Sequence, residues 1–296
     1  MQQDKPGVLG VVQFIHPGAE HKVDALGQTR WNLGEHRRKY MSAPGIAINQ
    51  NDEKIETGLY FWGEWEGLSL SVYSWADGEK DLPRHLVVPA FLMPKKVPGL
   101  QNTDPYVFGS EFKYTICKQV QKNGRETLLT RLLPGSLILF GSNLGGSFVL
   151  DTVFVVDDRI RRHSRETWQS VLSDASDTFK AASLLPLYWD ENVENSSQFT
   201  HYEGATFDKP KNGMYSFVPA LLETNEPTRF ARPRIDVEGI ISHTLNMNIK
   251  FSELGHSEVQ RIWASVRDQV REQKLALGVQ VAEPTFRTTL DLSRLD

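Results

Sequence analysis

Residues 134–156 read PGSLILFGSNLGGSFVLDTVFVV, and this stretch indicates the fold class. Pro134 and Gly135 predict a turn that leads into a short apolar strand over residues 136–140. A polar, Gly-rich connection follows, and residues 148–156 predict a second strand because they are rich in β-branched side chains. Two such strands form an antiparallel hairpin, with glycines where backbones approach closely. We therefore expect a small, curved antiparallel sheet that resembles a β-barrel.

Further strands and short helices are predicted around this hairpin. A β-branched run over residues 7–15 and an aromatic, partly alternating run over residues 58–75 are typical of strands. The basic segment 30–42 predicts a short helix, and the segment 164–184 predicts another, for which Ser164 is the expected cap.

The longest predicted helix spans residues 257–277. Ser257 is its expected cap and Gly278 its expected end, because the apolar side chains between them recur at helical spacing. These side chains are Val259, Ile262, Trp263, Val266, Val270 and Leu275. The predicted fold class is therefore α+β, with flanking helices and a long C-terminal helix beside the curved sheet.

The composition is that of an ordinary globular protein. The chain has 296 residues, with 33 Lys plus Arg against 37 Asp plus Glu and a formal net charge of −4. These values exclude disordered and collagen-like chains, and also proteins that coat nucleic acid with a uniformly basic surface. The length predicts one compact α+β unit over residues 1–296, or two intimately packed parts over about 1–160 and 161–296.

Several classes of protein lack support in the sequence. The single cysteine excludes an internal disulfide and CxxC zinc or redox motifs. No GxGxxG, GxxxxGK, GxSxG or HExxH motif is present, so we expect no cofactor and no resident metal. The N-terminal sequence does not read as a signal peptide, and no apolar run approaches the ~20 residues that cross a bilayer. We expect a cytoplasmic protein with no membrane partner.

The first unusual cluster is His16, Glu20 and His21, in the loop FIHPGAEH that leaves the first strand. Such residues bind a metal or act as acid and base. Pro17 and Gly18 prevent helical i, i+4 spacing, however, and no third ligand is evident nearby. A structural or solvated role is the alternative.

A basic segment, RWNLGEHRRKY, occupies residues 30–40. Its cations, with Trp31 between them, fit phosphate contact combined with base stacking. A second basic stretch over residues 159–165 would extend this surface, although neighbouring acidic residues dilute it. The candidate nucleic-acid contacts are Arg37, Arg38, Lys39, Arg161 and Arg162. The alternative is a solvated helix face.

An aromatic turn, FWGEWE, occupies residues 61–66. Trp62 and Trp65 beside Glu64 suit a flat ring such as a nucleobase, which needs stacking faces and an acceptor for its N–H groups. Packing of both tryptophans in the core is the alternative.

Cys117 lies in the segment QNTDPYVFGSEFKYTICKQ, residues 101–119. A lone cysteine is usually a small buried hydrophobe, but Lys113 and Lys118 are close in sequence and a cation favours the thiolate. In a pocket, Cys117 would attack an electrophilic carbon while a neighbouring group moves protons. The candidates for proton transfer are Asp104, Glu111 and His36, and further candidates for contact with a bound base are Phe108, Trp31, His16 and His21.

The segments PGSLILFGS and FVLDTVFVV resemble the PUA-like superfamily, which includes ASCH, EVE and YTH domains, over residues 85–160. This resemblance implies binding of RNA or DNA, often with a modified base inserted into an aromatic pocket. The segments FIHPGAEH, WNLGEHRRKYM, FWGEWEG and QNTDPYVFGSEFKYTICKQ also resemble bacterial proteins of the 7-deazaguanine DNA modification system. In that system the nitrile of 7-cyano-7-deazaguanine is converted to an amide.

Two main hypotheses follow. The first is a nitrile hydratase, or another enzyme that alters a modified base in DNA, with Cys117 as nucleophile. The second is a reader without catalytic activity that stacks a modified base on Trp62 or Trp65. A third possibility is a scaffold subunit of a modification or defence complex, with other proteins of that system as partners.

Overall fold

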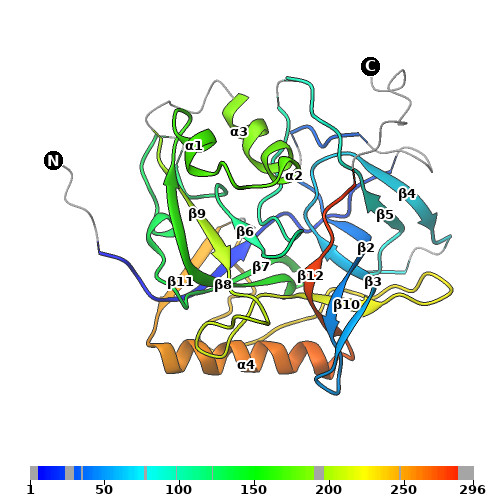
Figure 1. Cartoon of the computed structure of the whole chain (residues 1–296). Coiled ribbons are helices and arrows are strands. Elements are labelled where there is room, and N and C mark those ends of the chain that lie inside the picture. The colour runs from blue at the N-terminus through cyan, green and yellow to red at the C-terminus, as the bar shows by residue number, and fades with distance from the viewer. Residues whose placement is uncertain are drawn as a thin grey trace.

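The computed structural model describes residues 6–23, 30–34, 36–76, 79–97, 99–121, 123–189, 197–246 and 248–285. Most of its regular structure consists of strands, which assemble into two six-stranded sheets (Figure 1). Helices are few, and the longest lies across one end of the sheets. The predicted α+β class is confirmed.

The first sheet contains the predicted hairpin. Its strand order is β11–β1–β7–β8–β9–β6, with β7 antiparallel to β8 and parallel to β1. Gly145 and Gly146 form the turn between β7 and β8 with positive φ angles, which glycine adopts without steric strain. The strands are β1 (Gly10–Ile15), β6 (Lys113–Tyr114), β7 (Leu137–Leu144), β8 (Ser147–His163), β9 (Phe199–Gly204) and β11 (Ile249–Glu253).

The second sheet is built around a long hairpin of β2 and β3. Its order is β12–β10–β3–β2–β5–β4, and a further pairing of β12 with β2 closes four of these strands into a ring. At one end of the hairpin Lys39 lies opposite Gly63, and at the other Ile48 lies opposite Lys54. The strands are β2 (Lys39–Ile48), β3 (Lys54–Gly63), β4 (Ser69–Ser74), β5 (His85–Pro89), β10 (Val218–Leu222) and β12 (Ala276–Val281).

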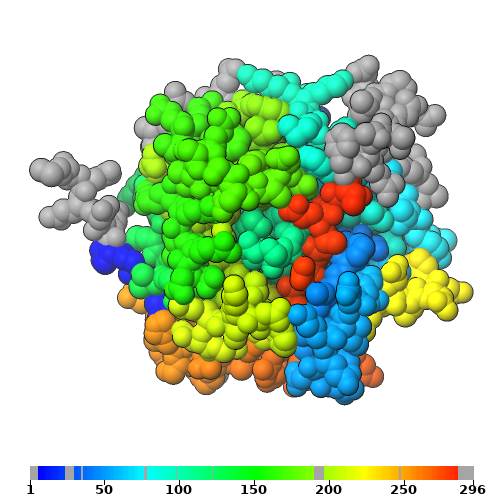
Figure 2. Space-filling view, viewed as in Figure 1, coloured from blue at the N-terminus to red at the C-terminus, as the bar shows by residue number. Residues whose placement is uncertain are grey.

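The two sheets share one apolar core. Phe14 of β1 and Phe140 of β7 belong to the same buried cluster as Met41 of β2 and Phe61 of β3. At the edge of this core the Gly109 N–H donates to the Val281 carbonyl at 2.7 Å. Figure 2 shows the corresponding contact on the surface, where the red residues of β12 lie beside the teal residues around β6. The core therefore fixes one sheet against the other.

Helix α4 (His256–Glu272) covers a second apolar cluster below the sheets (Figure 1). Its buried residues are Val259, Ile262, Trp263, Val266 and Val270, which is the predicted stripe without Leu275. The helix is capped by Gly255 instead of Ser257 and stops earlier than predicted. Residues from Ala276 onward continue as β12, where Gly278 pairs with Val218, so the predicted helix end at Gly278 is wrong.

Two shorter predicted helices are also wrong in part. Most of the second half of segment 30–42 is strand β2, because its residues pair with β3 and β5. Glu35, within this segment, lies outside the described residues. The segment 164–184 forms short turns instead of one helix. These are α1 (Trp168–Val171), α2 (Asp177–Phe179) and a π-helical turn (Lys180–Leu184). Two further short elements lie outside this segment. They are α3 (Leu185–Trp189), which follows it directly, and a 3₁₀ turn (Leu128–Arg131), which precedes β7.

Both sheets draw strands from before and after residue 160, and a domain boundary there would fall inside β8. Among the helices of the described residues, none is both long enough and apolar enough to span a bilayer.

Candidate functional site

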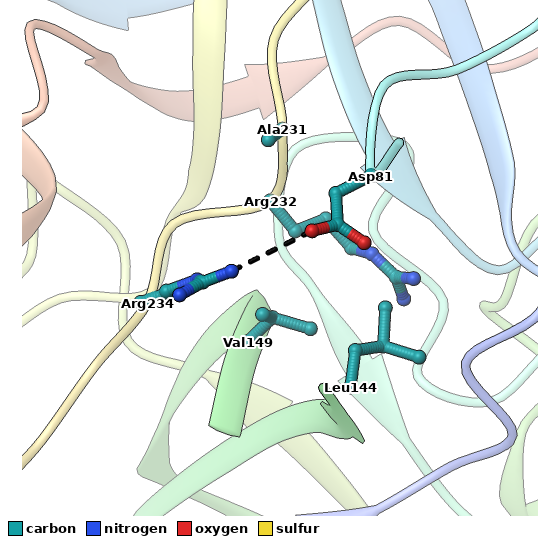
Figure 3. A pocket seen from close by; sticks show the side chains of 6 residues that line it. All are labelled: Asp81, Leu144, Val149, Ala231, Arg232 and Arg234. Carbon is teal, nitrogen blue, oxygen red and sulfur yellow. Dashed lines mark hydrogen bonds and ion pairs between the residues drawn. The ribbon is translucent and has the colours of Figure 1, made fainter. Parts of the chain in front are cut away.

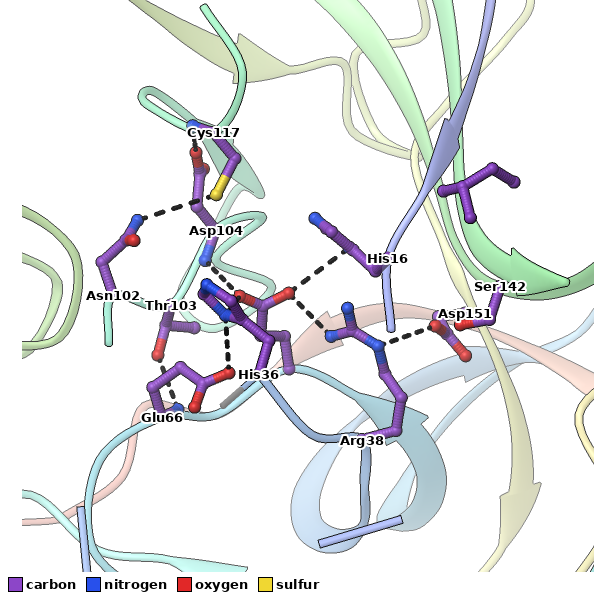
Figure 4. Close-up of polar contacts among 12 residues, drawn as sticks. His16, His36, Arg38, Glu66, Asn102, Thr103, Asp104, Cys117, Ser142 and Asp151 are labelled. Atoms are coloured by element: carbon purple, nitrogen blue, oxygen red, sulfur yellow. Dashed lines mark hydrogen bonds and ion pairs between the residues drawn. The ribbon is translucent and has the colours of Figure 1, made fainter. Parts of the chain in front are cut away.

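A buried group of charged side chains lies where β2 begins and β3 ends. His36 and Arg38 come immediately before β2, and Glu64 and Glu66 come immediately after β3. Because Lys39 pairs with Gly63, the strand register brings these four residues to the same end of the hairpin. Figure 4 shows His36, Arg38 and Glu66 with residues from other parts of the chain.

Glu64 is the centre of this group. Its Oε2 accepts a hydrogen bond from Arg38 Nη1 at 2.7 Å and lies 3.4 Å from His16 Nδ1. Its Oε1 lies 3.5 Å from His36 Nδ1. Burial opposes ionisation of Glu64, but the Arg38 guanidinium and the neighbouring histidines hold its pKa below the ordinary value. Glu64 is therefore a buried carboxylate whose charge is matched by surrounding cations.

His16 is positioned by the last residues of β1. Burial lowers its pKa well below the ordinary value, so the ring is neutral near pH 7. Its Nδ1 faces Glu64, and its buried Nε2 has no hydrogen-bond partner among the described residues. A neutral ring that donates through Nδ1 keeps a lone pair on Nε2, which suits a general base.

Cys117 lies beside this group, at the end of a loop folded around Asp104. The Asp104 carboxylate accepts backbone N–H bonds from Thr115, Ile116 and Cys117 at 3.0, 2.7 and 2.6 Å. Burial raises the pKa of Asp104 to about 7, against these hydrogen bonds. The backbone N–H of Asp104 in turn donates to Glu64 Oε1 at 3.4 Å.

The thiol of Cys117 is half-buried and has one side-chain donor near it. Asn102 Nδ2 lies 3.9 Å from Cys117 Sγ. Burial raises the pKa of Cys117 well above its ordinary value, and the charges of Asp104 and Glu64 add to this effect. Lys118, which the sequence suggested as an activating cation, opposes this rise in the pKa of Cys117 only in part, and its ammonium group donates to the Ile15 carbonyl at 2.6 Å. Cys117 is therefore a thiol in the resting protein.

A chain of buried ion pairs connects Glu64 with Arg232. Arg38 Nε lies 3.4 Å from Asp151 on β8, and Asp151 lies 3.6 Å from Arg232 Nη1. Arg232 lines a small pocket with Asp81, Leu144, Val149, Ala231 and Arg234 (Figure 3). Asp81 pairs with Arg234 at 3.5 Å within this pocket. The pocket and the Glu64 group thus share one electrostatic network.

The structure places the predicted aromatic contacts in the core. Trp62 and Trp65 are 3% and 1% exposed, and their indole N–H groups donate to the carbonyls of Phe230 and Leu68. Phe108 is fully buried against Trp65. Trp31 is half-buried. The core-packing alternative therefore describes Trp62 and Trp65.

Several other predicted residues lie apart from Cys117. Glu111 contacts Arg159 and Ser110 at the surface. Glu20 accepts the backbone N–H groups of Arg84 and His85, which is a structural role. His21 is half-buried, and burial together with Lys39 and Arg37 lowers its pKa to about 3. The predicted grouping of His16, Glu20 and His21 is therefore divided, and only His16 reaches the Glu64 group.

The predicted basic surface is also divided. Arg38 and Lys39 are buried, with Arg38 bound to Glu64 and the Lys39 ammonium bound to the carbonyls of Trp65 and Gly67. Neither forms an exposed phosphate contact. Arg161 pairs with Glu203 and Asp174, and Arg162 pairs with Glu126. Arg37 is half-buried beside the group.

Sequence reasoning missed four members of the network. Glu66 had a usable signal, because it is a second carboxylate within the segment FWGEWE that supplied the candidate Glu64. Asn102, Asp151 and Arg232 carry no local signal, since their roles depend on contacts between distant segments. Comparison of the chain with protein-family models, with curated proteins and with solved structures finds no match.

The arrangement of buried and half-buried groups suits polar covalent chemistry. It combines a thiol, a carboxyl group whose pKa lies near neutrality and an imidazole nitrogen without a partner. Perturbed ionisable groups that converge in this way are typical of active sites, although buried ion-pair networks also produce them.

Proposed function

We propose that this protein is an enzyme that hydrates the nitrile of 7-cyano-7-deazaguanine in DNA to the amide, with Cys117 as the nucleophile. The observation that carries the proposal is the setting of Cys117. The side chain of Asn102 approaches its sulfur, Asp104 binds its backbone N–H, and Glu64 contacts the backbone of Asp104. The single cysteine thus lies at the edge of the buried charge network.

The first step is addition of the thiol to the nitrile. The sulfur forms a bond to the nitrile carbon, one C–N π bond breaks, and the nitrogen takes up a proton to give a thioimidate. The thiol releases one proton as it adds, so the step is balanced without an external acid. We assign the relay of that proton to Asp104, whose carboxylate accepts the backbone N–H of Cys117 at 2.6 Å.

The second step is attack of water on the thioimidate carbon. The water oxygen bonds to that carbon and the remaining C–N π bond breaks, while Nε2 of His16, which has no partner among the described residues, carries a proton from the water to the nitrogen. The C–S bond then breaks as the C–O double bond forms and the hydroxyl group releases its proton. The sulfur recovers a proton, and the carbon retains both its nitrogen and the new oxygen as an amide. The net change is the gain of one water, with the thiol regenerated.

A sequence resemblance also supports this proposal. Residues 85–160, which resemble a PUA-like domain, include Asp104 and Cys117, and this resemblance is the basis for proposing a nucleic-acid substrate. The proposal includes a cytoplasmic location and proteins of the same modification system as partners. The reader hypothesis requires an exposed aromatic face, whereas Trp62 and Trp65 are packed in the core. The burial of both tryptophans therefore favours the enzyme hypothesis over the hypothesis of a reader without catalytic activity.

The test is mass spectrometry of nucleosides after the protein acts on DNA that contains 7-cyano-7-deazaguanine. We expect the modified nucleoside to gain one water with the wild-type protein and not with Cys117→Ala. Cys117→Ser is the matched variant, because it retains the shape and hydrogen bonds of the thiol but is a weaker nucleophile. Intact-protein mass spectrometry should also detect a covalent adduct that carries the full mass of the substrate.

Either of two results would overturn the proposal. Absence of any mass change with the folded wild-type protein would remove this substrate. Equal conversion by Cys117→Ala would retain the hydration but remove Cys117 as its nucleophile. Circular dichroism of each variant checks that the comparison is made between folded proteins.

A further inference from the structure

We infer that His36, Glu64 and Glu66 bind a divalent transition-metal ion, with Zn²⁺ as the representative case. His36 Nδ1 and one carboxylate oxygen from each glutamate all lie within 4.8 Å of one another. One imidazole and two carboxylates are ligands that first-row divalent ions accept. The inference goes beyond the reaction proposed for Cys117 and does not depend on it.

The β2–β3 hairpin explains why these three residues meet. His36 lies three positions before Lys39, and Glu64 follows Gly63 directly, while Lys39 and Gly63 are paired across the hairpin. Glu66 is two residues beyond Glu64, and its Oε1 also reaches His36 Nδ1. The ligands are therefore held by the end of one strand pair, which is a rigid support for a metal site.

The separations fit a small ion. Bonds of roughly 2.0–2.2 Å to nitrogen and oxygen place neighbouring ligand atoms roughly 3–3.5 Å apart. His36 Nδ1 is 3.2 Å from Glu66 Oε1 and 3.5 Å from Glu64 Oε1. The Glu64 and Glu66 oxygens lie within 4.8 Å of each other, so these two side chains would move closer together to coordinate one ion with His36.

A separate observation points to a ligand at this place. Glu66 is 0% exposed, yet its Oε2 has no hydrogen-bond partner among the described residues. Asn32 is 4% exposed, its backbone contacts that of Glu66, and both polar atoms of its side chain lack partners within the same residues. Buried polar atoms are costly when unsatisfied, so they indicate a group that is still to be bound.

The outer contacts are those that orient metal ligands. Arg38 and His16 contact Oε2 of Glu64, whereas Oε1 lies near His36 and accepts the backbone N–H of Asp104. The Thr103 hydroxyl accepts the backbone N–H of Glu66. Such second contacts fix ligand orientation and contribute to metal affinity. The positive charge of Arg38 is shared with Asp151, which limits its repulsion of a cation.

Access comes from the His36 side. Its side chain is 30% exposed, whereas those of Glu64 and Glu66 are 1% and 0% exposed. An ion can therefore enter past His36 and keep water in a fourth position, as in open metal sites with three protein ligands.

The experiment is titration of the chelator-treated full chain with Zn²⁺ by calorimetry, and with Co²⁺ by visible absorption. We expect one ion per chain. Glu66→Gln, which keeps the size of the side chain, should weaken affinity at least about tenfold. The matched control is Asp236→Asn. Asp236 lies 3.2 Å from His243, the same distance as Glu66 from His36, but among the described residues this pair belongs to no three-ligand group.

The control should bind Zn²⁺ as the wild-type protein does, and Mg²⁺ should bind much more weakly than Zn²⁺. His36→Gln is the second variant, since its partly exposed position is more tolerant of change. Absence of stoichiometric Zn²⁺ binding by the wild-type chain would overturn the inference. Affinity for Zn²⁺ that is unchanged in folded Glu66→Gln and in folded His36→Gln would also overturn the inference. Neither result would bear on nitrile hydration, which the nucleoside assay measures separately.

Discussion

Arg38 and Arg162 belong to the same predicted basic surface but lie in opposite environments. Arg38 is buried between Glu64 and Asp151, whereas the side chains of Arg162 and its partner Glu126 are 47% and 42% exposed. Charges removed from water need partners, and the loss of one partner leaves the other uncompensated. An exposed pair is screened by solvent and contributes little. The two arginines should therefore differ strongly in their effect on stability.

We expect Arg38→Leu to lower the free energy of unfolding by about 3–5 kcal/mol, because Glu64 and Asp151 lose their shared cation. Arg162→Leu, the matched change at the surface, should lower it by about 1 kcal/mol or less. Urea denaturation of both variants measures the difference. Similar values for the two arginines would show that the buried network does not hold this end of the hairpin together.

At the level of elements, α4 stabilises the fold through one face. Ile262 is buried in the cluster below the sheets, while its neighbour Arg261 is exposed. We expect Ile262→Ala to destabilise the protein by about 2–4 kcal/mol through lost burial and the cavity left behind. Arg261→Ala should change stability by about 0.5 kcal/mol or less. Thermal or urea unfolding checks both, and a small effect of Ile262→Ala would mean that α4 is docked loosely.

The elements also show where sequence reasoning succeeds. The hairpin of β7 and β8 and the apolar stripe of α4 follow from patterns that are complete within one short segment. The basic segment 30–42 predicts a helix when it is considered alone. Pairing with β3, a separate segment, makes most of its second half a strand. The same limit applies to the site. Cys117 and Asp104 were selected from one segment, whereas Asp151 and Arg232 join them only through contacts between distant strands and loops.

At the level of the whole molecule, buried neutral histidines make stability depend on pH. His163 is fully buried, contacts Thr115 and Tyr188, and lies near Arg161 and His201. Burial and the Arg161 charge lower its pKa to about 3. In the unfolded chain its pKa is about 6.5. Between pH 6.5 and pH 3, His163 therefore binds a proton in the unfolded chain but not in the folded protein.

The sign of the effect follows from linkage. The contribution of His163 is fully present above pH 6.5 and is lost as pH falls toward 3. Between pH 7.5 and pH 5 the loss is about 2 kcal/mol, at about 1.4 kcal/mol for each pH unit below 6.5. His163→Gln removes this titration and keeps a side chain able to bond Thr115 and Tyr188. Between pH 7.5 and pH 5, the free energy of unfolding of His163→Gln should fall by about 2 kcal/mol less than that of the wild type.

Urea denaturation of both proteins at the two pH values measures the difference. Parallel losses in both proteins would mean that His163 binds a proton as readily in the folded state as in the unfolded chain, so that burial of His163 does not lower stability in acid.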